Sequence, residues 1–371
     1  MGGGDIVGAS GISSGVYGTK GAAAATNVPG GREYAASWRD SSGNFWLFGG
    51  SESIYLFVTG SPVLNDLWEY GPVPQEWTWV SRSDTTNALG TYGIQGTAAA
   101  ANVPGARWAP TTWTDSSGNL WLFGGSGYDS TGQNGFLNDL WEFVPAYMTW
   151  TWISGSQDCC ETSVYGTQGV ASTTNIPAAR FAATGWRDSN GNLWLFGGGS
   201  ESFANDLWEY NPVANTWIWI MGNEPYSYGV YGTQGTPSST NIPAARLGGF
   251  GWTDSSGNFW LFGGGIPGSV PPGLMSDFFD DLWEFNSAAN EWTWMSGSEV
   301  SINSNFGNKR GVYGMLGVAA TSNVPGSRVM PTGWLDSQGN LWLLGGQSFD
   351  SAADPAGAQR GMLNDLWRYQ P

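Results

Sequence analysis

The chain has 371 residues, a formal net charge of −17 from 13 basic and 30 acidic residues, 24 tryptophans, 58 glycines and no histidine. This apolar and aromatic composition excludes an intrinsically disordered chain, and the acidic balance disfavours nucleic acids and anionic membranes as partners. The lack of histidine excludes the Ser-His and Cys-His nucleophile pairs and removes the commonest zinc and copper ligand.

The cysteines, the apolar runs and the first residues of the chain bear on its disulfides, membrane insertion and location. The two cysteines, Cys159 and Cys160, are adjacent, so they cannot form a disulfide framework, and we expect an ordinary loop pair whose redox state stays open. Apolar runs are too short for a membrane span, and glycines rather than a signal peptide follow Met1. The lysine-poor composition, rich in Ser, Thr, Asn, Gly and Trp, nevertheless favours an extracellular or periplasmic location.

Two motifs recur five times along the chain. Copies of the first, Asp-Ser-Ser-Gly-Asn-Phe-Trp-Leu-Phe-Gly-Gly, end at Gly50, Gly125, Gly198, Gly264 and Gly346. Copies of the second, Asn-Asp-Leu-Trp-Glu-Tyr or a near match, begin at Asn65, Asn138, Asn205, Asp280 and Asn364. Repeats of this kind bury their apolar faces only by stacking on neighbours, so we predict a single repeat domain over residues 1–371.

The third repeat shows the elements expected in each unit. Residues 180–186 and 193–196 are predicted to form the first two strands, joined by a glycine-containing tight turn at residues 188–192. The second strand is large on both faces, which indicates that it is covered on both sides. Residues 206–210 and 216–219 supply the third and fourth strands. Four antiparallel strands per repeat describe a propeller blade, and we favour it over a sandwich array or open solenoid because those leave apolar edges unpaired.

The predicted fold is therefore all-β, a five-bladed β-propeller with four antiparallel strands per blade. The blades are expected at approximately residues 32–81, 107–154, 180–221, 246–296 and 328–371. No Trp-x-Trp fourth strand follows the third strand of the last unit, which ends near Tyr369. We expect residues 1–10 to close that blade as a weak strand; otherwise its open edge permits self-association or pairing with another chain.

The units resemble a known repeat. Gly-Gly after the second strand, an aromatic residue in the third, Trp in the fourth and Pro-x-x-Arg before the next unit are similar to the kelch repeat over residues 27–371. The resemblance implies a propeller that serves mostly as a binding platform, with a galactose-oxidase-like minority of copper enzymes. The units here are longer than the roughly 50 residues of a kelch repeat, five blades are fewer than usual, and copper-ligating histidines are absent.

Each unit also carries one arginine and one acid at equivalent positions. The arginines are Arg32, Arg107, Arg180, Arg246 and Arg328, and the acids are Asp66, Asp139, Asp206, Asp281 and Asp365. Because arginine is rarely buried unpaired, we expect ion pairs or bonds to loop carbonyls within the blades. The kelch resemblance implies the alternative, that the arginines lie near the channel mouth and offer guanidinium groups to an acidic partner. They are candidate ligand-binding residues together with Trp108, the one tryptophan outside the repeated positions.

Loop lengths distinguish the two ends of the blades. The turns after the first and third strands are short and similar, whereas the connections after the second strand vary. These long connections cover residues 51–64, 126–137, 199–204, 265–279 and 347–363. Variable loops on a rigid scaffold are where binding sites concentrate, so we expect a site at this long-loop end. The segments before each first strand begin with Tyr-Gly, at Tyr17, Tyr92, Tyr165, Tyr231 and Tyr313, and are expected to form a structural collar. A repeated ligand pocket is the alternative.

These features favour a non-enzymatic binding scaffold, secreted or surface-exposed, with a protein or glycan partner. A carbohydrate-binding lectin or glycoside-acting enzyme at the same end, and a structural or self-assembling repeat, are the alternatives. A glycosidase requires two carboxylates about 5–10 Å apart, which the sequence alone does not pair, so no catalytic residue is predicted. No cofactor is expected either; calcium at residues 277–281 or 350–354 is an alternative, although neither segment matches an EF-hand loop.

Overall fold

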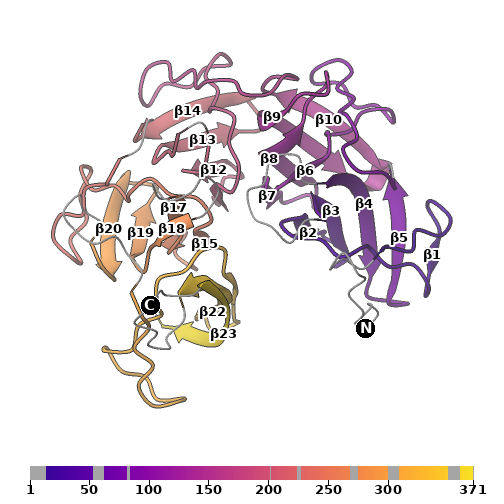
Figure 1. Cartoon of the computed structure of the whole chain (residues 1–371). Coiled ribbons are helices and arrows are strands. Elements are labelled where there is room, and N and C mark those ends of the chain that lie inside the picture. The colour runs from indigo at the N-terminus through magenta and orange to yellow at the C-terminus, as the bar shows by residue number, and fades with distance from the viewer. Residues whose placement is uncertain are drawn as a thin grey trace. The chain divides into compact units, whose positions relative to one another are not determined.

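The computed structural model describes residues 14–52, 62–81, 84–200, 202–223, 227–267, 275–299, 309–349 and 360–370. It is almost entirely β, with five antiparallel blade sheets that follow one another along the chain (Figure 1), and it confirms the predicted β-propeller fold. Within these ranges the only helical element is the 3-10 turn η1, Pro145–Tyr147, and no helix has the length and apolarity needed to cross a membrane. The chain divides into two compact units, residues 1–182 with 210–218, and residues 183–209 with 219–371.

The first unit contains blades 1 and 2. The strands of blade 1 are β2 (Ala36–Arg39), β3 (Phe45–Ser51), β4 (Val63–Gly71) and β5 (Glu76–Ser81). The short strand β1 (Ala23–Ala24) pairs with β5 at the outer edge of blade 1. The strands of blade 2 are β7 (Thr111–Thr114), β8 (Leu120–Tyr128), β9 (Asn134–Val144) and β10 (Thr149–Ser154). A two-residue strand, β6 (Arg107–Trp108), pairs with the far end of β8.

The third sheet draws on both units, and blades 4 and 5 belong to the second. The strands of blade 3 are β11 (Thr184–Arg187), β12 (Leu193–Phe196), β13 (Leu207–Asn211) and β14 (Thr216–Met221). Blade 4 comprises β15 (Phe250–Thr253), β16 (Phe259–Phe262), β19 (Leu282–Asn286) and β20 (Glu291–Ser296), with the hairpin β17 (Gly265–Pro267) and β18 (Met275–Phe278) between its second and third strands. Blade 5 comprises β21 (Thr332–Leu335), β22 (Leu341–Phe349) and β23 (Arg360–Tyr369), so the described part of this blade has three strands rather than the predicted four.

The strands of the third repeat lie close to their predicted positions. The second strand matches at residues 193–196 and is buried on both faces, as predicted. The first strand begins at Thr184 rather than Arg180 because Ala182 has a left-handed φ of 52°, which interrupts extended backbone. The residues predicted to close the last blade, 1–10, lie outside the described residues.

The turn after each first strand is held by one aspartate. In blade 2, Asp115 Oδ1 accepts hydrogen bonds from the backbone N–H groups of Ser117 and Asn119, at 2.8 and 2.9 Å. Its Oδ2 accepts the Trp121 indole N–H at 3.1 Å, which ties the turn to the second strand. Gly118 supplies the required positive φ of 84°. This arrangement explains why the Asp-x-x-Gly-Asn motif recurs almost unchanged.

Most of the tryptophans lie in the core. Of the 24 indoles in the chain, 15 are buried. In the first unit the Trp38 indole of blade 1 donates to Trp121 O of blade 2 at 3.0 Å, and it lies in the same apolar cluster as Trp141 and Trp150. In the second unit Trp186 donates to the corresponding carbonyl of blade 4 at 3.0 Å. Within each unit, therefore, neighbouring blades bury their indoles against each other.

Candidate functional site

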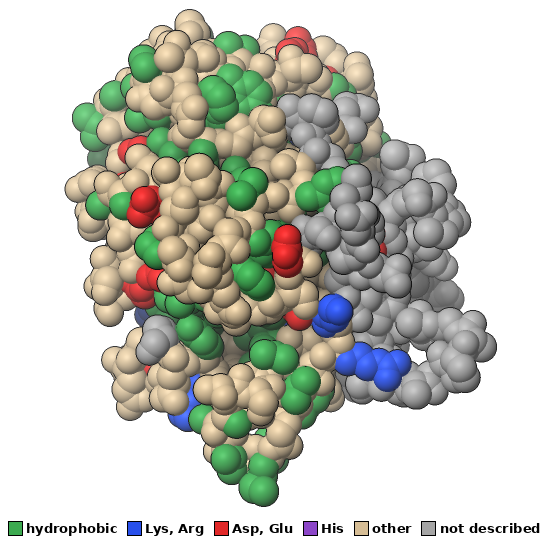
Figure 2. All heavy atoms as spheres, turned by 90° about the vertical axis from the view of Figure 1, so that its left-hand side faces the viewer, with side chains coloured by type: hydrophobic (Ala, Val, Ile, Leu, Met, Phe, Trp, Pro, Cys, Tyr) green, Lys and Arg blue, Asp and Glu red, His purple; other side chains and the backbone are tan. Residues whose placement is uncertain are grey.

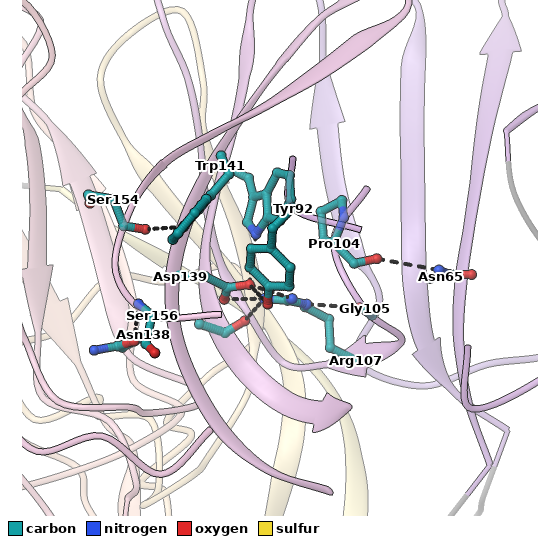
Figure 3. Close-up of polar contacts among 12 residues, drawn as sticks. Asn65, Tyr92, Pro104, Gly105, Arg107, Asn138, Asp139, Trp141, Ser154 and Ser156 are labelled. Atoms are coloured by element: carbon teal, nitrogen blue, oxygen red, sulfur yellow. Dashed lines mark hydrogen bonds and ion pairs between the residues drawn. The ribbon is translucent and has the colours of Figure 1, made fainter. Parts of the chain in front are cut away.

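The predicted site arginines lie inside the blades, and Arg107 shows their setting (Figure 3). Its side chain is wholly buried. The guanidinium Nε donates to Gly105 O at 3.0 Å, and Nη1 donates to Gly124 O at 2.9 Å. Nη1 and Nη2 also form a bidentate ion pair with Asp139, at 2.6 and 2.7 Å. The arginine therefore joins the segment before β6 to the middle of β8 and to β9.

Two further side chains donate hydrogen bonds to Asp139. The Tyr92 hydroxyl and the Trp141 indole N–H each donate to Asp139 Oδ2 at 2.7 Å (Figure 3). Burial and the negative charge of Asp139 raise the pKa of Tyr92 well above its ordinary value. Burial opposes the charged form of Arg107, but the charge and hydrogen bonds of Asp139 outweigh it and raise the pKa of this arginine. Arg107, Asp139, Tyr92 and Trp141 form what we call a buried quartet.

The buried quartet repeats around the described blades. Equivalent sets are Arg32–Asp66–Tyr17–Trp68, Arg246–Asp281–Tyr231–Trp283 and Arg328–Asp365–Tyr313–Trp367. Arg180 is 1% exposed and donates from Nε to Ala178 O at 3.0 Å. Of the two expectations for these arginines, ion pairing within the blade is confirmed for Arg32, Arg107, Arg246 and Arg328, and their guanidinium groups are not exposed. The tyrosines of these four sets come from the segments predicted to form the collar.

Trp108 has a different environment, at the long-loop end of the first unit. It is partly exposed, and its ring centroid lies 5.8 Å from that of Tyr34 and 5.1 Å from that of Phe181. Phe181 stacks in turn on Phe136 at 5.1 Å. We call these four residues the aromatic row. Its members come from three successive repeats. Phe181 is buried, whereas Tyr34, Trp108 and Phe136 are partly exposed aromatic side chains, which suits contact with a ligand.

The connections after the second strands differ from blade to blade, as predicted. In blade 2, β8 and β9 continue as a paired hairpin to Tyr128 and Asn134. In blade 3 the connection is a short bend closed by a bridge between Gly199 and Phe203. In blade 4 it carries the separate hairpin β17–β18. Residues 53–61 of blade 1 and 350–359 of blade 5 lie outside the described residues.

The tip of the blade 2 hairpin is fixed by Asp129. This buried carboxylate accepts hydrogen bonds from Thr131, from the Gln133 N–H at 2.9 Å and from the Cys159 N–H at 3.2 Å. Burial alone raises the pKa of Asp129, but these hydrogen bonds hold it below its usual value. Cys159 and Cys160 are free thiols in the loop after β10, and burial with the neighbouring thiol raises the pKa of Cys159 to about 12.

A cavity of about 420 Å³ opens in the first unit at the opposite end of the strands. Its lining includes Trp38, Arg39, Phe45, Trp77 and Thr114. These residues flank the short turns, so the cavity belongs to the short-turn end and not to the long-loop end. Aromatic rings beside hydroxyl and guanidinium donors make it a second candidate site, one that the sequence analysis did not identify.

The short-turn end also carries paired carboxylates. In blade 2 the Asn119 amide bridges Asp115 Oδ2 at 3.1 Å and Glu142 Oε1 at 2.8 Å. Burial and the charge of Asp115 raise the pKa of Glu142. Glu69, Glu209 and Glu284 have pKa values raised by the same two causes in their own blades. The native fold therefore makes the charged form of these glutamates less favourable than it is in the unfolded chain.

The charge repulsion between Asp115 and Glu142, together with burial, predicts the effect of Glu142→Gln. A raised native pKa contributes stability that is fully present below the unfolded value of about 4.3 and is lost as the pH rises through the native value. Glutamine is neutral at every pH and therefore avoids the unfavourable charge that Glu142 carries at high pH. We expect the variant to be more stable than the wild type at pH 7, by up to about 1 kcal/mol after solvent screening, with a flatter profile between pH 4 and 7. Urea denaturation across this pH range measures the difference. Glu161→Gln, at an exposed position, is the control and should change little; a Glu142→Gln variant less stable at pH 7 contradicts the argument.

Metal binding has no support among the residues described. In residues 14–52, 62–81, 84–200, 202–223, 227–267, 275–299, 309–349 and 360–370, no three His, Cys, Asp or Glu side chains are grouped to hold an ion. The calcium alternative at residues 277–281 falls within these ranges, whereas that at 350–354 lies outside them.

Comparison with known proteins places the fold but not a family. No protein-family model matches the chain, and no curated protein matches it. A solved structure titled "Structure of YjhT" is similar, with a TM-score of 0.51 and 15% sequence identity over 92% of this chain and 82% of that chain. At this identity the likeness supports the β-propeller fold alone.

Proposed function

We propose that the chain is a non-enzymatic, kelch-type binding scaffold that engages its partner through the long-loop end of the blades. The observation that carries this proposal is a contrast within each blade: the buried quartet recurs from blade to blade, whereas the connection after the second strand differs. The buried quartets hold the glycines where each connection leaves its second strand, at Gly49, Gly124, Gly263 and Gly345. The connections beyond those glycines have a different structure in each of blades 2, 3 and 4.

In this proposal the arginines act beneath the binding surface. Their donors are used by carbonyl groups and by aspartates, so they position loops and do not meet the partner. The aromatic row, with Trp108 at its centre, supplies the contact surface beside the blade 2 hairpin. The surface composition fits an extracellular or periplasmic setting, since acidic side chains are scattered and basic ones few on the face drawn in Figure 2.

A carbohydrate ligand is the second candidate, and the cavity at the short-turn end favours it. Sugars stack on aromatic rings and bond to polar groups at their edges, and the cavity offers Phe45, Trp77, Arg39 and Thr114. Binding there involves the end of the blades opposite to the long loops. The two candidates therefore make different predictions for single substitutions.

A binding screen with three matched variants tests the proposed function. The wild type, Trp108→Ala, Phe45→Ala and Tyr147→Ala are compared on a glycan array and on an immobilised peptide library. Tyr147 is 77% exposed in the turn between β9 and β10, so its variant controls for the loss of any surface aromatic. The proposal predicts ligands whose affinity falls at least tenfold in Trp108→Ala only, a hot-spot loss of about 1.4 kcal/mol or more.

The remaining outcomes separate the alternatives. Glycan binding that is lost in Phe45→Ala and kept in Trp108→Ala assigns the function to the cavity. Release of reducing sugar from a bound glycan identifies a glycoside-acting enzyme. Ligands that bind all three variants equally well contradict both surfaces.

A further inference from the structure

The two cysteines contact each other in the loop that follows β10. The thiol of Cys160 donates to the Cys159 Sγ, and the two sulfur atoms lie 2.8 Å apart. This separation is well inside the ordinary contact distance of unbonded atoms, and it is less than about 1 Å longer than a disulfide bond. Cys159 is buried and Cys160 is exposed, so solvent reaches one residue of the pair.

The main chain of the pair is fixed by the blade 2 hairpin. Cys160 N donates to Phe136 O at 2.8 Å, and Cys159 N donates to Asp129 Oδ2 at 3.2 Å. Cys160 has a left-handed φ of 69°, a conformation that residues with a Cβ rarely adopt. Backbone held in such a conformation by its surroundings often marks a functional position. Since Phe136 is a member of the aromatic row, the pair is also attached to the long-loop end.

Gly135 of β9 leaves the space that the two sulfur atoms occupy. A Cβ at this position would lie 2.8 Å from the Cys159 Sγ and closer still to the Cys160 Sγ. Gly135 pairs with Gly127 in the β8–β9 ladder and does not have a left-handed φ, so its backbone conformation does not require a glycine. The requirement comes from the sulfur pair, which a side chain at residue 135 would displace.

We propose that Cys159 and Cys160 form a reversible redox site, which low-molecular-weight disulfides oxidise to a vicinal disulfide. The Cys160 thiolate attacks one sulfur of the reagent RSSR, whose S–S bond breaks with release of RS⁻. The Cys159 sulfur then loses its proton, attacks the Cys160 Sγ and displaces the second RS⁻. The two RS⁻ ions take up the two protons given up by the cysteines. Two electrons therefore pass from the protein to the reagent, and two RSH molecules form.

The surroundings of the two thiols determine the order of these steps. Burial, followed by the neighbouring thiol, raises the pKa of Cys159 to about 12, so the exposed Cys160 supplies the first thiolate. Neighbouring Cα atoms are about 3.8 Å apart, below the range of about 4.4–6.8 Å in ordinary disulfides. The ring closed by this bond is therefore strained and readily reduced, which suits reversible exchange and not a permanent cross-link.

Oxidation in glutathione buffers tests the redox site. The full chain is equilibrated with mixtures of reduced and oxidised glutathione, remaining thiols are blocked with N-ethylmaleimide, and the products are identified by mass spectrometry. We expect a monomer that has lost two hydrogen atoms from the segment containing both cysteines, and that regains both thiols as reduced glutathione is raised. The equilibrium constant for oxidation should be at least tenfold larger than for the same chain unfolded in urea, a difference of about 1.4 kcal/mol, because the fold already holds the sulfur atoms together.

Two pairs of variants distinguish a positioned pair from two thiols that are merely adjacent. Gly135→Ala displaces the sulfur atoms and should lower the equilibrium constant about tenfold. Asn134→Ala, at the neighbouring exposed position, is the matched control and should leave the constant unchanged. Cys159→Ser should stop the reaction at the glutathione adduct of Cys160, whereas Cys160→Ser should keep its buried Cys159 unmodified.

Five outcomes overturn the proposal. These are no loss of thiols in oxidised glutathione; a wild-type glutathione adduct that persists without closing; a disulfide between two chains in non-reducing electrophoresis; a native equilibrium constant no larger than that of the unfolded chain; and a Gly135→Ala constant equal to that of the wild type. Melting curves show that each variant is folded under the conditions of the measurement.

Discussion

Asp139→Ala is expected to be among the most damaging substitutions in the first unit, lowering the free energy of unfolding by about 3–5 kcal/mol. The substitution removes the acceptor of Arg107, Tyr92 and Trp141 at once and leaves a buried guanidinium charge without its counter-ion. Chemical denaturation followed by tryptophan fluorescence measures the loss. A folded variant with wild-type stability contradicts the role assigned to the buried quartet.

The equivalent quartet of blade 5 provides the control. The Asp365 side chain is 13% exposed, and its partner Tyr313 is half-exposed, so water can replace part of what the carboxylate supplies. Asp365→Ala should therefore cost clearly less than Asp139→Ala. Equal losses in the two blades indicate that burial of the ion pair is not the source of the effect.

Gly124→Ala is expected to be comparably destabilising, at about 3–5 kcal/mol, for a steric reason. Gly124 has a φ of 64°, and a Cβ at this position lies 2.5 Å from Arg180 O and 2.8 Å from Leu137 O, both backbone atoms that cannot move independently. The same glycine accepts the Arg107 hydrogen bond, so a shift of the backbone also disturbs the quartet. Thermal and urea denaturation measure the effect.

Gly96→Ala separates the cost of a steric clash from the cost of placing alanine in the left-handed conformation. Gly96 has a similar φ of 75°, but a Cβ there meets no atom within 4 Å. We expect a loss of only about 1–2 kcal/mol, the ordinary cost of a left-handed alanine. If both variants lose the same stability, the close approach to Arg180 and Leu137 is not what requires a glycine at residue 124.

Much of the fold follows from the sequence because the repeat reports the same local structure five times. The turn motif predicts its aspartate and glycine, and the second strand of the third repeat lies at the predicted residues 193–196. The arginine and aspartate series predicts ion pairs within blades, and Arg32, Arg107, Arg246 and Arg328 form them. Each of these features depends on residues close in sequence or on side chains that recur at fixed positions.

The candidate sites are less accessible to sequence analysis because they combine residues that do not repeat. The aromatic row joins Tyr34, Trp108, Phe136 and Phe181. Trp108 and Phe181 both follow the repeated arginine, but the other repeats carry glutamate, leucine or valine at that position, so the repeat does not predict an aromatic residue there. The cavity depends on where side chains of β2, β3, β5 and β7 leave space. The recurring Tyr-Gly motif marks the tyrosine of the quartet in the sequence. Its partner aspartate lies 47 residues away in blade 2, so the motif does not predict the pairing.

The collar has a consequence for how such a chain can grow. Each collar precedes in the sequence the blade whose fourth strand it contacts. In blade 2 the stretch from about residue 84 to residue 155 therefore encodes the collar and all four strands of one complete blade. A tandem duplication with its breakpoints just upstream of successive collar tyrosines inserts an intact module and divides no sheet. Breakpoints placed between the third and fourth strands separate the Trp-x-Trp pair of the fourth strand from the collar that contacts it. We therefore expect recombination to be tolerated upstream of the collar tyrosines and selected against between the third and fourth strands.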